Sequence, residues 1–266
     1  MTDYRTLELE TRRDVAVIWM NRSDVRNAFN DTMIGELSQA LTSLEADDGI
    51  RAIVLAGRGL SFCAGADLHW MKKMAGYGAE QNYEDALGLA TMLHTLHTFK
   101  KPTVARVHGH AYAGGMGLVA ACDIAVAAFE AEFCLSEVRI GLIPATIGPY
   151  VIAAMGERAA RRYMLTAERF TAAEAYRVGF VHEIVPADDI DEKVEDVLAH
   201  LTRGGSAAHA ETKALINTIR ASPLNQELIA DTATRIARIR VSDEGREGIR
   251  AFLEKRKPAW AQDSRS

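Results

Sequence analysis

Two short runs of small residues, 63–67 (CAGAD) and 113–117 (AGGMG), are the places in this sequence that most clearly suggest chemistry. Each run follows an apolar, β-branched segment, 52–55 or 103–107, and precedes a helix-like stretch. A strand that ends in Gly and Ala and continues as a helix leaves backbone N–H groups unpaired at the helix start. Two such loops facing one point would hold a developing negative oxygen, as an oxyanion hole does. The pair therefore indicates an enzyme that stabilises an enolate-like anion.

Glu137 is the candidate for moving a proton at such a site. Its neighbours in the segment 133–144 are apolar or small, so partial desolvation is expected to raise its proton affinity. A glutamate tuned in this way exchanges protons near neutral pH. The alternative is an ordinary ion pair with Arg139 or another surface charge, and the sequence leaves that alternative open.

A dinucleotide site is a second interpretation of the glycines. Residues 115–120 (GMGLVA) match the GxGxxA fingerprint, with Glu137 about twenty residues further on. The fingerprint should open a βαβ unit directly after its strand, whereas residues 109–113 separate Val107 from the glycines. Neither run is followed by GK[ST], which excludes a phosphate-cradling P-loop. The oxyanion interpretation is therefore favoured, although either loop alone is equally consistent with tight packing of a helix on a sheet.

Composition narrows the class of protein. The 266 residues are 48% hydrophobic and 25% charged, which is typical of a globular domain. A net charge of −5 provides no basic field, so nucleic acid is not an expected partner. Three cysteines without a CxxC pair, and no secretory leader, favour a reducing, cytoplasmic setting. The longest apolar stretch, 118–129, is too short to span a bilayer, and no metal-ligand spacing is found, so neither membrane nor metal is expected.

Alternating strands and helices up to about Pro186 must position the two loops. Strands are predicted at residues 7–9 and 15–20, as an opening hairpin, and at 52–55, 103–107, 124–126 and 179–185. Asp31 is the expected cap of a first helix, and residues 86–96 repeat apolar side chains at helical spacing. From Ile190 onward the pattern is almost wholly helical. The sequence therefore predicts an α/β core followed by a helical tail.

Taken together, the motifs resemble those of the crotonase, or enoyl-CoA hydratase/isomerase, superfamily. Four of them, at residues 27–29, 61–68, 113–123 and 136–144, occur in the order and spacing of that family, and 252–258 (FLEKRKP) resembles its ending. The resemblance covers nearly the whole chain. It implies an α/β, ClpP-like spiral of ββα units in residues 1–195, carrying the acyl-CoA site. Residues 196–266 would then be a C-terminal helical trimerisation region.

The resemblance also implies roles for individual residues. The backbone N–H groups of Ala66 and Gly114 would polarise the thioester carbonyl of an acyl-CoA substrate, and Glu137 would transfer protons. The positions that correspond to the coenzyme A site are Arg26, Ala64, Asp67 and Leu68, with Phe252 and Lys255 of the tail near the adenine, in some members from a neighbouring subunit. No separate cofactor is implied, because coenzyme A is part of the substrate. The expected assembly is a homotrimer or a hexamer built as a dimer of trimers.

One position departs from the family pattern. Well-known hydratases of the family carry a second glutamate three residues after the second oxyanion glycine, where this chain has Gly117. Some enoyl-CoA isomerases of the family use a single glutamate at the later position, which Glu137 fills. Three functions therefore stay open: hydration of the 2,3 double bond, Δ3,Δ2 isomerisation, and acyl-CoA binding without chemistry. Retention of Glu137 argues against the last.

Finer likeness narrows the expected substrate. Residues 67–71, 116–119 and 137–150 are similar to those of bacterial hydratases for 3-methylglutaconyl-CoA and related carboxylated enoyl-CoA thioesters in leucine and acyclic isoprenoid catabolism. The resemblance therefore implies a lyase with a branched or carboxylated substrate. Such a substrate needs a cationic or hydrogen-bonding contact for its distal carboxylate, and His69, His110 and Tyr112 are near enough to the loops to be candidates.

Overall fold

Six strands form the larger of two sheets. The structure is a computed structural model that describes residues 3–261. The strands are, in spatial order, β1 (Leu7–Arg12), β2 (Val15–Met20), β3 (Ala52–Gly57), β5 (Thr103–Val107), β7 (Ile124–Ala128) and β10 (Glu183–Val185). The expected hairpin of β1 and β2 is confirmed, and the remaining neighbours pair in parallel. The last strand is shorter than predicted, because Gly179, with φ +79°, closes a turn before it.

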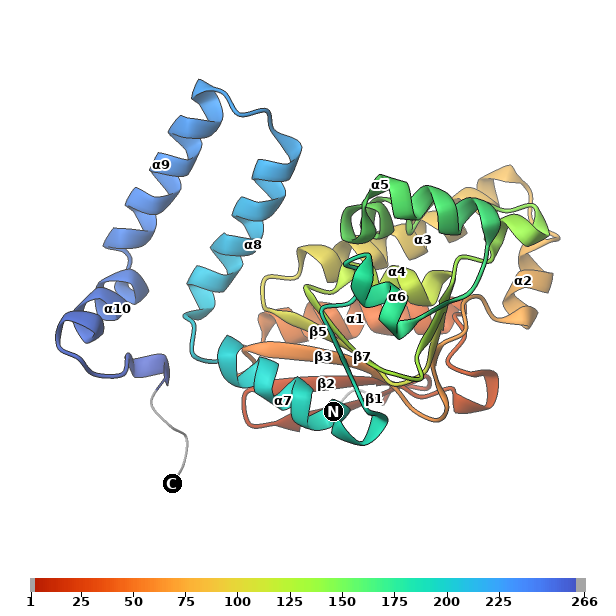
Figure 1. Cartoon of the computed structure of the whole chain (residues 1–266), viewed down its shortest axis with the longest axis horizontal. Helices are drawn as coiled ribbons and strands as arrows, with labels where there is room; N and C mark the ends of the chain where they lie inside the picture. Colours follow the sequence, from red (N-terminus) through yellow and green to blue (C-terminus); the bar gives the residue numbers. More distant parts are fainter. Residues whose placement is uncertain (1–2, 262–266) are drawn as a thin grey trace.

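Both faces of the larger sheet are covered, which explains why its strands read as continuous apolar runs. Val15, Val17 and Trp19 belong to the core beneath α7 (Ile190–Leu201). The alternate residues of β2 belong to the larger core on the opposite face. That face is covered by α1 (Asp31–Ala46), α3 (Ala79–Thr98), α4 (Gly114–Ala121) and α5 (Gly148–Thr166), whereas α7 lies on the other side (Figure 1).

Asn30, rather than the predicted Asp31, caps the first helix. Its side chain accepts a hydrogen bond from the Met33 N–H at 2.9 Å, and its backbone is extended, as an N-cap requires. Asp31 is instead the first helical residue, where its negative charge interacts favourably with the positive end of the helix dipole. The sequence placed the helix correctly and its cap one residue late.

A second, smaller sheet carries the loops. Its strands are β4 (Ser61–Cys63), β6 (His110–Tyr112), β8 (Glu132–Cys134) and β9 (Phe170–Thr171), in that order. The sequence missed all four, because strands of two or three residues are too short to show a period of two. The shorter helices are α2 (Leu68–Met74) and α6 (Ala172–Arg177), and 3-10 turns occur at Ser23–Val25, Glu137–Ile140, Ala187–Asp189 and Ala259–Ala261.

The C-terminal helices project from the core as an arm (Figure 1). The arm consists of α8 (Ser206–Ala221), α9 (Gln226–Val241) and α10 (Asp243–Leu253). The expected boundary at 195/196 falls inside α7, whose Val194 and Leu198 are buried against the larger sheet. Packing on the core therefore continues through α7, and the arm begins only with α8. Residues 262–266, the end of the expected helical region, lie outside the described residues.

None of the helices in the described part of the chain combines the length and the apolar character that crossing a bilayer would require.

Candidate active site

The three segments expected to form the site leave the same edge of the smaller sheet. β4 pairs in parallel with β6, and β6 pairs in parallel with β8. The carboxyl ends of parallel neighbours lie side by side. The loop 64–67 follows β4, the loop 113–117 follows β6, and Glu137 follows β8 by three residues. Strand pairing therefore brings together residues that are far apart in the sequence.

The two small-residue loops are in direct contact. A Cβ built on Gly65 would lie 3.2 Å from the Cβ of Ala113, and one built on Gly115 would lie 2.5 Å from the carbonyl oxygen of Cys63. A Cβ built on Gly114 would lie 2.7 Å from the ring of Phe29. The glycines are thus required by close approach of backbone to backbone and to a buried ring. Larger residues would separate the loops.

The backbone around Ala66 directs its N–H away from the neighbouring segment. Phe29 donates to the carbonyl of Gly65 at 2.7 Å and accepts from the N–H of Asp67 at 2.8 Å. Ala66 lies between these two bonds in a parallel bridge with Phe29, so its own N–H points to the opposite side. Within residues 3–261, no acceptor is found for this N–H.

Gly114 offers a second free donor. It is the first residue of α4, where the N–H group has no partner within the helix, and no other acceptor lies in the described chain. Ala113 before it has φ +46° and ψ −118°, an unusual conformation for a residue with a side chain. Its N–H donates to the carbonyl of Cys134 at 2.8 Å, which fixes this turn to the end of β8. Strain of this kind is typical of functional sites.

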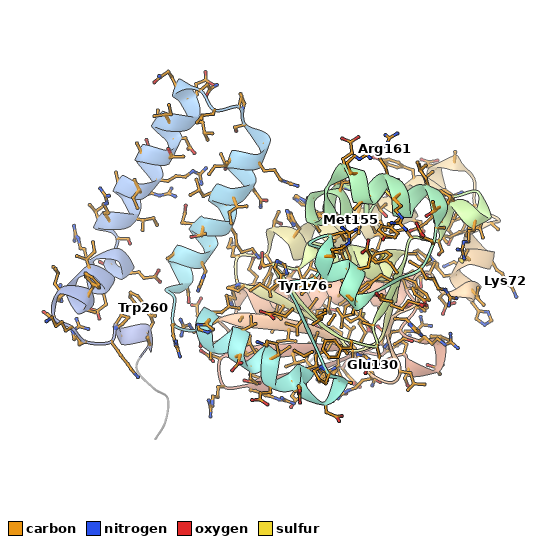
Figure 2. The ribbon with its side chains drawn as sticks, viewed as in Figure 1. Lys72, Glu130, Met155, Arg161, Tyr176 and Trp260 are labelled. Carbon is orange, nitrogen blue, oxygen red and sulfur yellow. The ribbon has the colours of Figure 1, made fainter. Side chains whose placement is uncertain are left out.

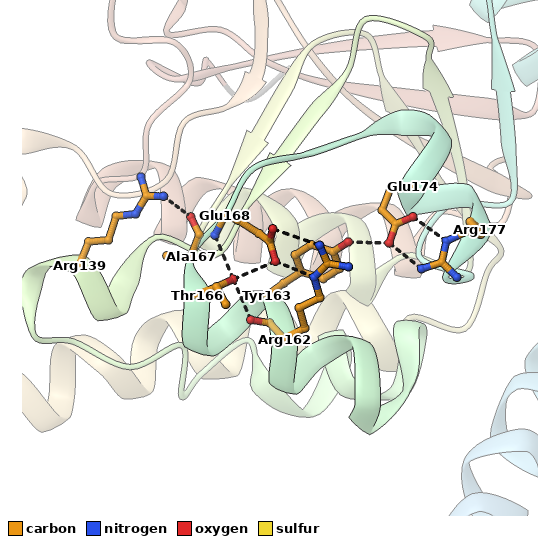
Figure 3. A network of polar contacts seen from close by, with 8 residues as sticks. All are labelled: Arg139, Arg162, Tyr163, Thr166, Ala167, Glu168, Glu174 and Arg177. Atoms are coloured by element: carbon orange, nitrogen blue, oxygen red, sulfur yellow. Dashed lines mark hydrogen bonds and ion pairs between the residues drawn. The ribbon is translucent and has the colours of Figure 1, made fainter.

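Glu137 is half-buried and lacks a charge partner. Its Oε2 atom is inaccessible to solvent and has no hydrogen-bond partner among the described residues. Burial raises the pKa of this carboxyl above its usual value, against a smaller opposing effect of a backbone N–H. The ion pair with Arg139 is not formed, because the Arg139 guanidinium donates to the carbonyl of Ala167 at 2.6 Å (Figure 3). An unpaired, partly desolvated carboxyl of this kind is suited to proton transfer.

The coenzyme A candidates near the first loop fall into two groups. Arg26 and Leu68 are exposed and Ala64 is half-buried, so they are accessible to a ligand. Asp67 is only 4% exposed. Its carboxylate accepts from Arg22 at 2.8 Å and from the N–H groups of His69 and Trp70, which caps α2. In this structure Asp67 positions the loop, and its contact with substrate stays a prediction.

Asn27 has a positioning role that the sequence did not assign. It is fully buried, and its side chain accepts from the Arg22 N–H and donates to the carbonyls of Arg58 and Ser61, all within 2.8–2.9 Å. The carbonyl of Arg26, the preceding residue, accepts from the Ala64 N–H at 3.0 Å. Asn27 therefore ties the turn before α1 to the start of β4 and thereby to the first loop. The sequence signal for Asn27 was its place in the motif at residues 27–29, which carried the family resemblance but no role for this side chain.

Phe252 lies on the arm and Lys255 directly after it, both away from the loops of the same chain. Phe252 is 82% exposed at the end of α10, and the C-terminal 3-10 turn with Trp260 lies at the opposite end of the molecule from Lys72 of α2, the helix that follows the first loop (Figure 2). One chain therefore does not bring these two residues to the site.

The candidates for binding a distal carboxylate are dispersed. His69 is exposed on α2. His110 and Tyr112 flank the buried Ala111 on β6, so they face away from the larger core, and the Tyr112 hydroxyl already donates to Glu132. The contact expected for a carboxylated substrate therefore stays a prediction. Across residues 3–261, no group of three or more His, Cys, Asp or Glu side chains is arranged to hold a metal ion.

Comparison with known proteins places this geometry in a family. The profile of the enoyl-CoA hydratase/isomerase family matches residues 10–263. The chain belongs to this family. It is similar to the crystal structure of an enoyl-CoA hydratase from Shewanella pealeana, with 44% identity, a TM-score of 0.94 and 96% of each chain covered. AtuE of Pseudomonas aeruginosa is 38% identical with a TM-score of 0.93, covering 97% of this chain and 100% of that one.

A mitochondrial relative gives the same result. The mitochondrial enoyl-CoA hydratase of Pongo abelii is 31% identical over 252 residues, which are 91% of this chain and 82% of that protein. The expected α/β crotonase fold is thereby confirmed. The chain is a member of the crotonase superfamily.

Proposed function

We propose that this chain is an enoyl-CoA hydratase that adds water across the 2,3 double bond of an enoyl-CoA thioester. One observation carries the proposal: Glu137, a half-buried carboxyl whose Oε2 atom has no hydrogen-bond partner in the described chain, follows the same sheet edge as two loops with free N–H groups. The similarity to proteins named as enoyl-CoA hydratases supports it. Coenzyme A enters as part of the substrate, and no separate cofactor is proposed.

The proposed reaction needs only these groups. Ionised Glu137 removes a proton from water as the water oxygen bonds to C3, and the π electrons of the double bond move toward the thioester. The resulting enolate oxygen is held by the N–H groups of Ala66 and Gly114. Protonated Glu137 then delivers its proton to C2, which regenerates the carboxylate. Fixed dipoles of this kind stabilise the anion without reorganising, and each donor is worth roughly a hundredfold or more in rate.

We further propose that the preferred substrate is branched or carboxylated, such as 3-methylglutaconyl-CoA. This rests on the likeness of residues 67–71 and 137–150 to hydratases of such substrates. Purified protein incubated with crotonyl-CoA and with 3-methylglutaconyl-CoA should lose enoyl absorbance faster with the latter. Equal or slower loss with 3-methylglutaconyl-CoA would refute the preference, and no loss with either would refute hydration.

Isomerisation is the second candidate, and the absence of an acidic side chain at Gly117 favours it. A Δ3,Δ2-enoyl-CoA isomerase would convert a 3-enoyl-CoA to the conjugated thioester without taking up water. Incubating a 3-enoyl-CoA and a 2-enoyl-CoA separately in water enriched with heavy oxygen distinguishes the two functions. An isomerase converts the first without incorporating the label, and a hydratase incorporates the label into the product of the second. Tight binding of the thioester without either reaction would indicate a non-catalytic acyl-CoA-binding protein.

We also propose that copies of the chain associate through the arm, as a trimer or a hexamer. The large apolar side chains that α8–α10 leave exposed in the described chain support this: Ile216, Ile219, Ile229, Ile236, Val241, Ile249, Phe252 and Leu253. In such an assembly, Phe252 and Lys255 of one copy would reach the coenzyme A of another.

A further inference from the structure

Gly117 and Ile147 are in contact so close that neither position can take a larger side chain. A Cβ built on Gly117 would lie 2.2 Å from Cγ2 of Ile147 and 2.9 Å from its Cβ. The Cδ1 atom of Leu93 would lie 3.7 Å away. Real carbon atoms do not approach within 3 Å without a shift of one of them. The space at position 117 is therefore already filled by Ile147.

The position of Ile147 is set by its backbone. Its carbonyl accepts from the N–H groups of Tyr150 and Val151, both at 3.1 Å, at the start of α5. Its side chain is only 2% exposed. The severe overlap is with Cγ2, which a β-branched side chain holds in a restricted χ1 rotamer, whereas the Cβ atom, at 2.9 Å, is only slightly too close. Relief therefore requires either a smaller residue at 147 or movement of α4 relative to α5.

This contact lies next to the groups proposed to act on the thioester. Gly117 follows Gly114 by one turn of α4, so a side chain at 117 would stand beside the second oxyanion donor. Ile147 is the last residue of the connection that runs from Glu137 to the start of α5 at Gly148. An acidic side chain at 117 would thus be the second carboxyl of the site. Ile147 excludes it.

We propose that Ile147 is a specificity-determining residue that restricts the site to one proton-transfer carboxyl, Glu137. The inference rests on the proposed function for its chemical meaning. With one carboxyl, the same group must take the proton from water and return it to C2, so a single ionisation controls turnover. The steric part of the proposal can be measured without any activity.

The steric part is tested by a double-mutant cycle on purified full-length protein. Gly117→Ala should lower the unfolding midpoint by roughly 3–10 °C, as overpacking does in a domain of this size. Ile147→Ala also lowers it, because it removes buried side-chain volume. The double variant should unfold near the midpoint of Ile147→Ala alone, so the two losses are not additive. Additive losses would overturn the proposal.

Gly88→Ala serves as the matched control. Gly88 lies in α3 with open space around its Cβ position. Combined with Ile147→Ala, it should show no coupling, since distant sites add. These unfolding measurements give a result even if the wild-type protein neither hydrates nor isomerises an enoyl-CoA. A failure of the proposed function is therefore distinguishable from a failure of this inference.

The chemical part is tested by moving the carboxyl. In an E137Q background, the G117E/I147A/E137Q protein should turn over at least tenfold faster than the I147A/E137Q protein. The same recovery by G117E with Ile147 intact would overturn the proposal, because Ile147 would then exclude nothing. A folded G117E/I147A/E137Q protein without recovery would also overturn it, because position 117 would not reach the reacting carbons.

The pH dependence gives a readout that a purely structural role would not change. Turnover by the wild-type enzyme should show a single ionisation, that of Glu137. G117E/I147A with Glu137 intact should show two, since paired carboxyls titrate as a coupled unit. A wild-type profile with two ionisations in the carboxyl range would contradict the proposal.

Discussion

The carboxyl of Glu137 is partly desolvated, and the cation two residues after it, Arg139, is bonded elsewhere. Replacing Glu137 with Gln keeps the shape of the side chain and removes its proton-transfer ability. We expect turnover to fall by roughly 10²–10⁴-fold with little change in CoA-ester affinity. Loss of enoyl absorbance and a direct binding measurement test the two effects. A Glu137→Gln protein with full activity would contradict the assignment.

The same residue predicts a pH effect on stability. Burial raises the pKa of Glu137 in the folded state, so the folded chain holds this proton more tightly than the unfolded chain does. The difference in free energy of unfolding between the wild-type protein and Glu137→Gln should therefore favour the wild type most strongly below the ordinary glutamate pKa. It should decline as pH rises through the raised pKa. Denaturant midpoints of both proteins across this range test the sign, and a constant difference would contradict it.

Gly114 is confined by the ring of Phe29, which leaves no room for a Cβ atom. Gly114→Ala should displace the N–H donor and lower turnover by roughly 10²–10³-fold. Kinetics with the best substrate measure this loss. Gly35→Ala is the matched control, because Gly35 lies in α1 with open space. It should leave turnover unchanged and stabilise the protein by roughly 0.5–1 kcal/mol.

At the scale of elements, the turn before α1 and the strand β4 are joined by the three hydrogen bonds of Asn27. Asn27→Ala should lower the free energy of unfolding by about 2–4 kcal/mol, since each net bond contributes roughly 0.5–1.5 kcal/mol. Turnover should fall as well, because the carbonyl of Arg26 no longer holds Ala64 in place. Asn21→Ala, at an exposed position after β2, is the control and should change neither the free energy of unfolding nor turnover beyond the roughly 0.5 kcal/mol typical of a surface substitution.

The elements also show what the sequence could and could not predict. The strands β2, β3 and β5 and the periodic helices could be predicted because their apolar patterns are long and they are buried on defined faces. The strands β4, β6 and β8 were not, although they are the elements that hold the site. Glu137 and the two loops were predicted as the site from residue types and family resemblance, and the structure places them at one edge of the smaller sheet. The contact of Gly117 with Ile147 was not, because 30 positions separate them and only the fold brings them together.

At the scale of the whole molecule, the arm is held to the core by few contacts. The Lys213 ammonium group on α8 donates to Asp123 at 2.6 Å and to the carbonyl of Lys101 at 3.1 Å, and Asp123 in turn accepts from Thr103. His97 of α3 is within 3.2 Å of the Asn217 side chain. Most apolar side chains of the arm nevertheless remain exposed. Burial against another copy of the chain would explain why these apolar side chains are exposed in a single copy.

That association can be tested by charge. Ile236→Glu, on α9, should shift the protein toward the monomer in sedimentation velocity, because a carboxylate in an apolar interface is costly. CoA-ester affinity should fall with it if Phe252 and Lys255 act across the interface. Leu60→Glu is the control, an exposed apolar residue on the core. An Ile236→Glu protein with unchanged mass would contradict a role for this face.

The smaller sheet has one more consequence. The three segments of the candidate site are brought together by strand pairing and not by continuity of the chain, and the exposed turn around Gly76 and Gly78 lies between the first segment and the other two. A backbone break there would leave every strand pair intact. Two separately expressed fragments, 1–76 and 77–266, should therefore recombine into an active enzyme, and this chain offers a natural point for building a split reporter.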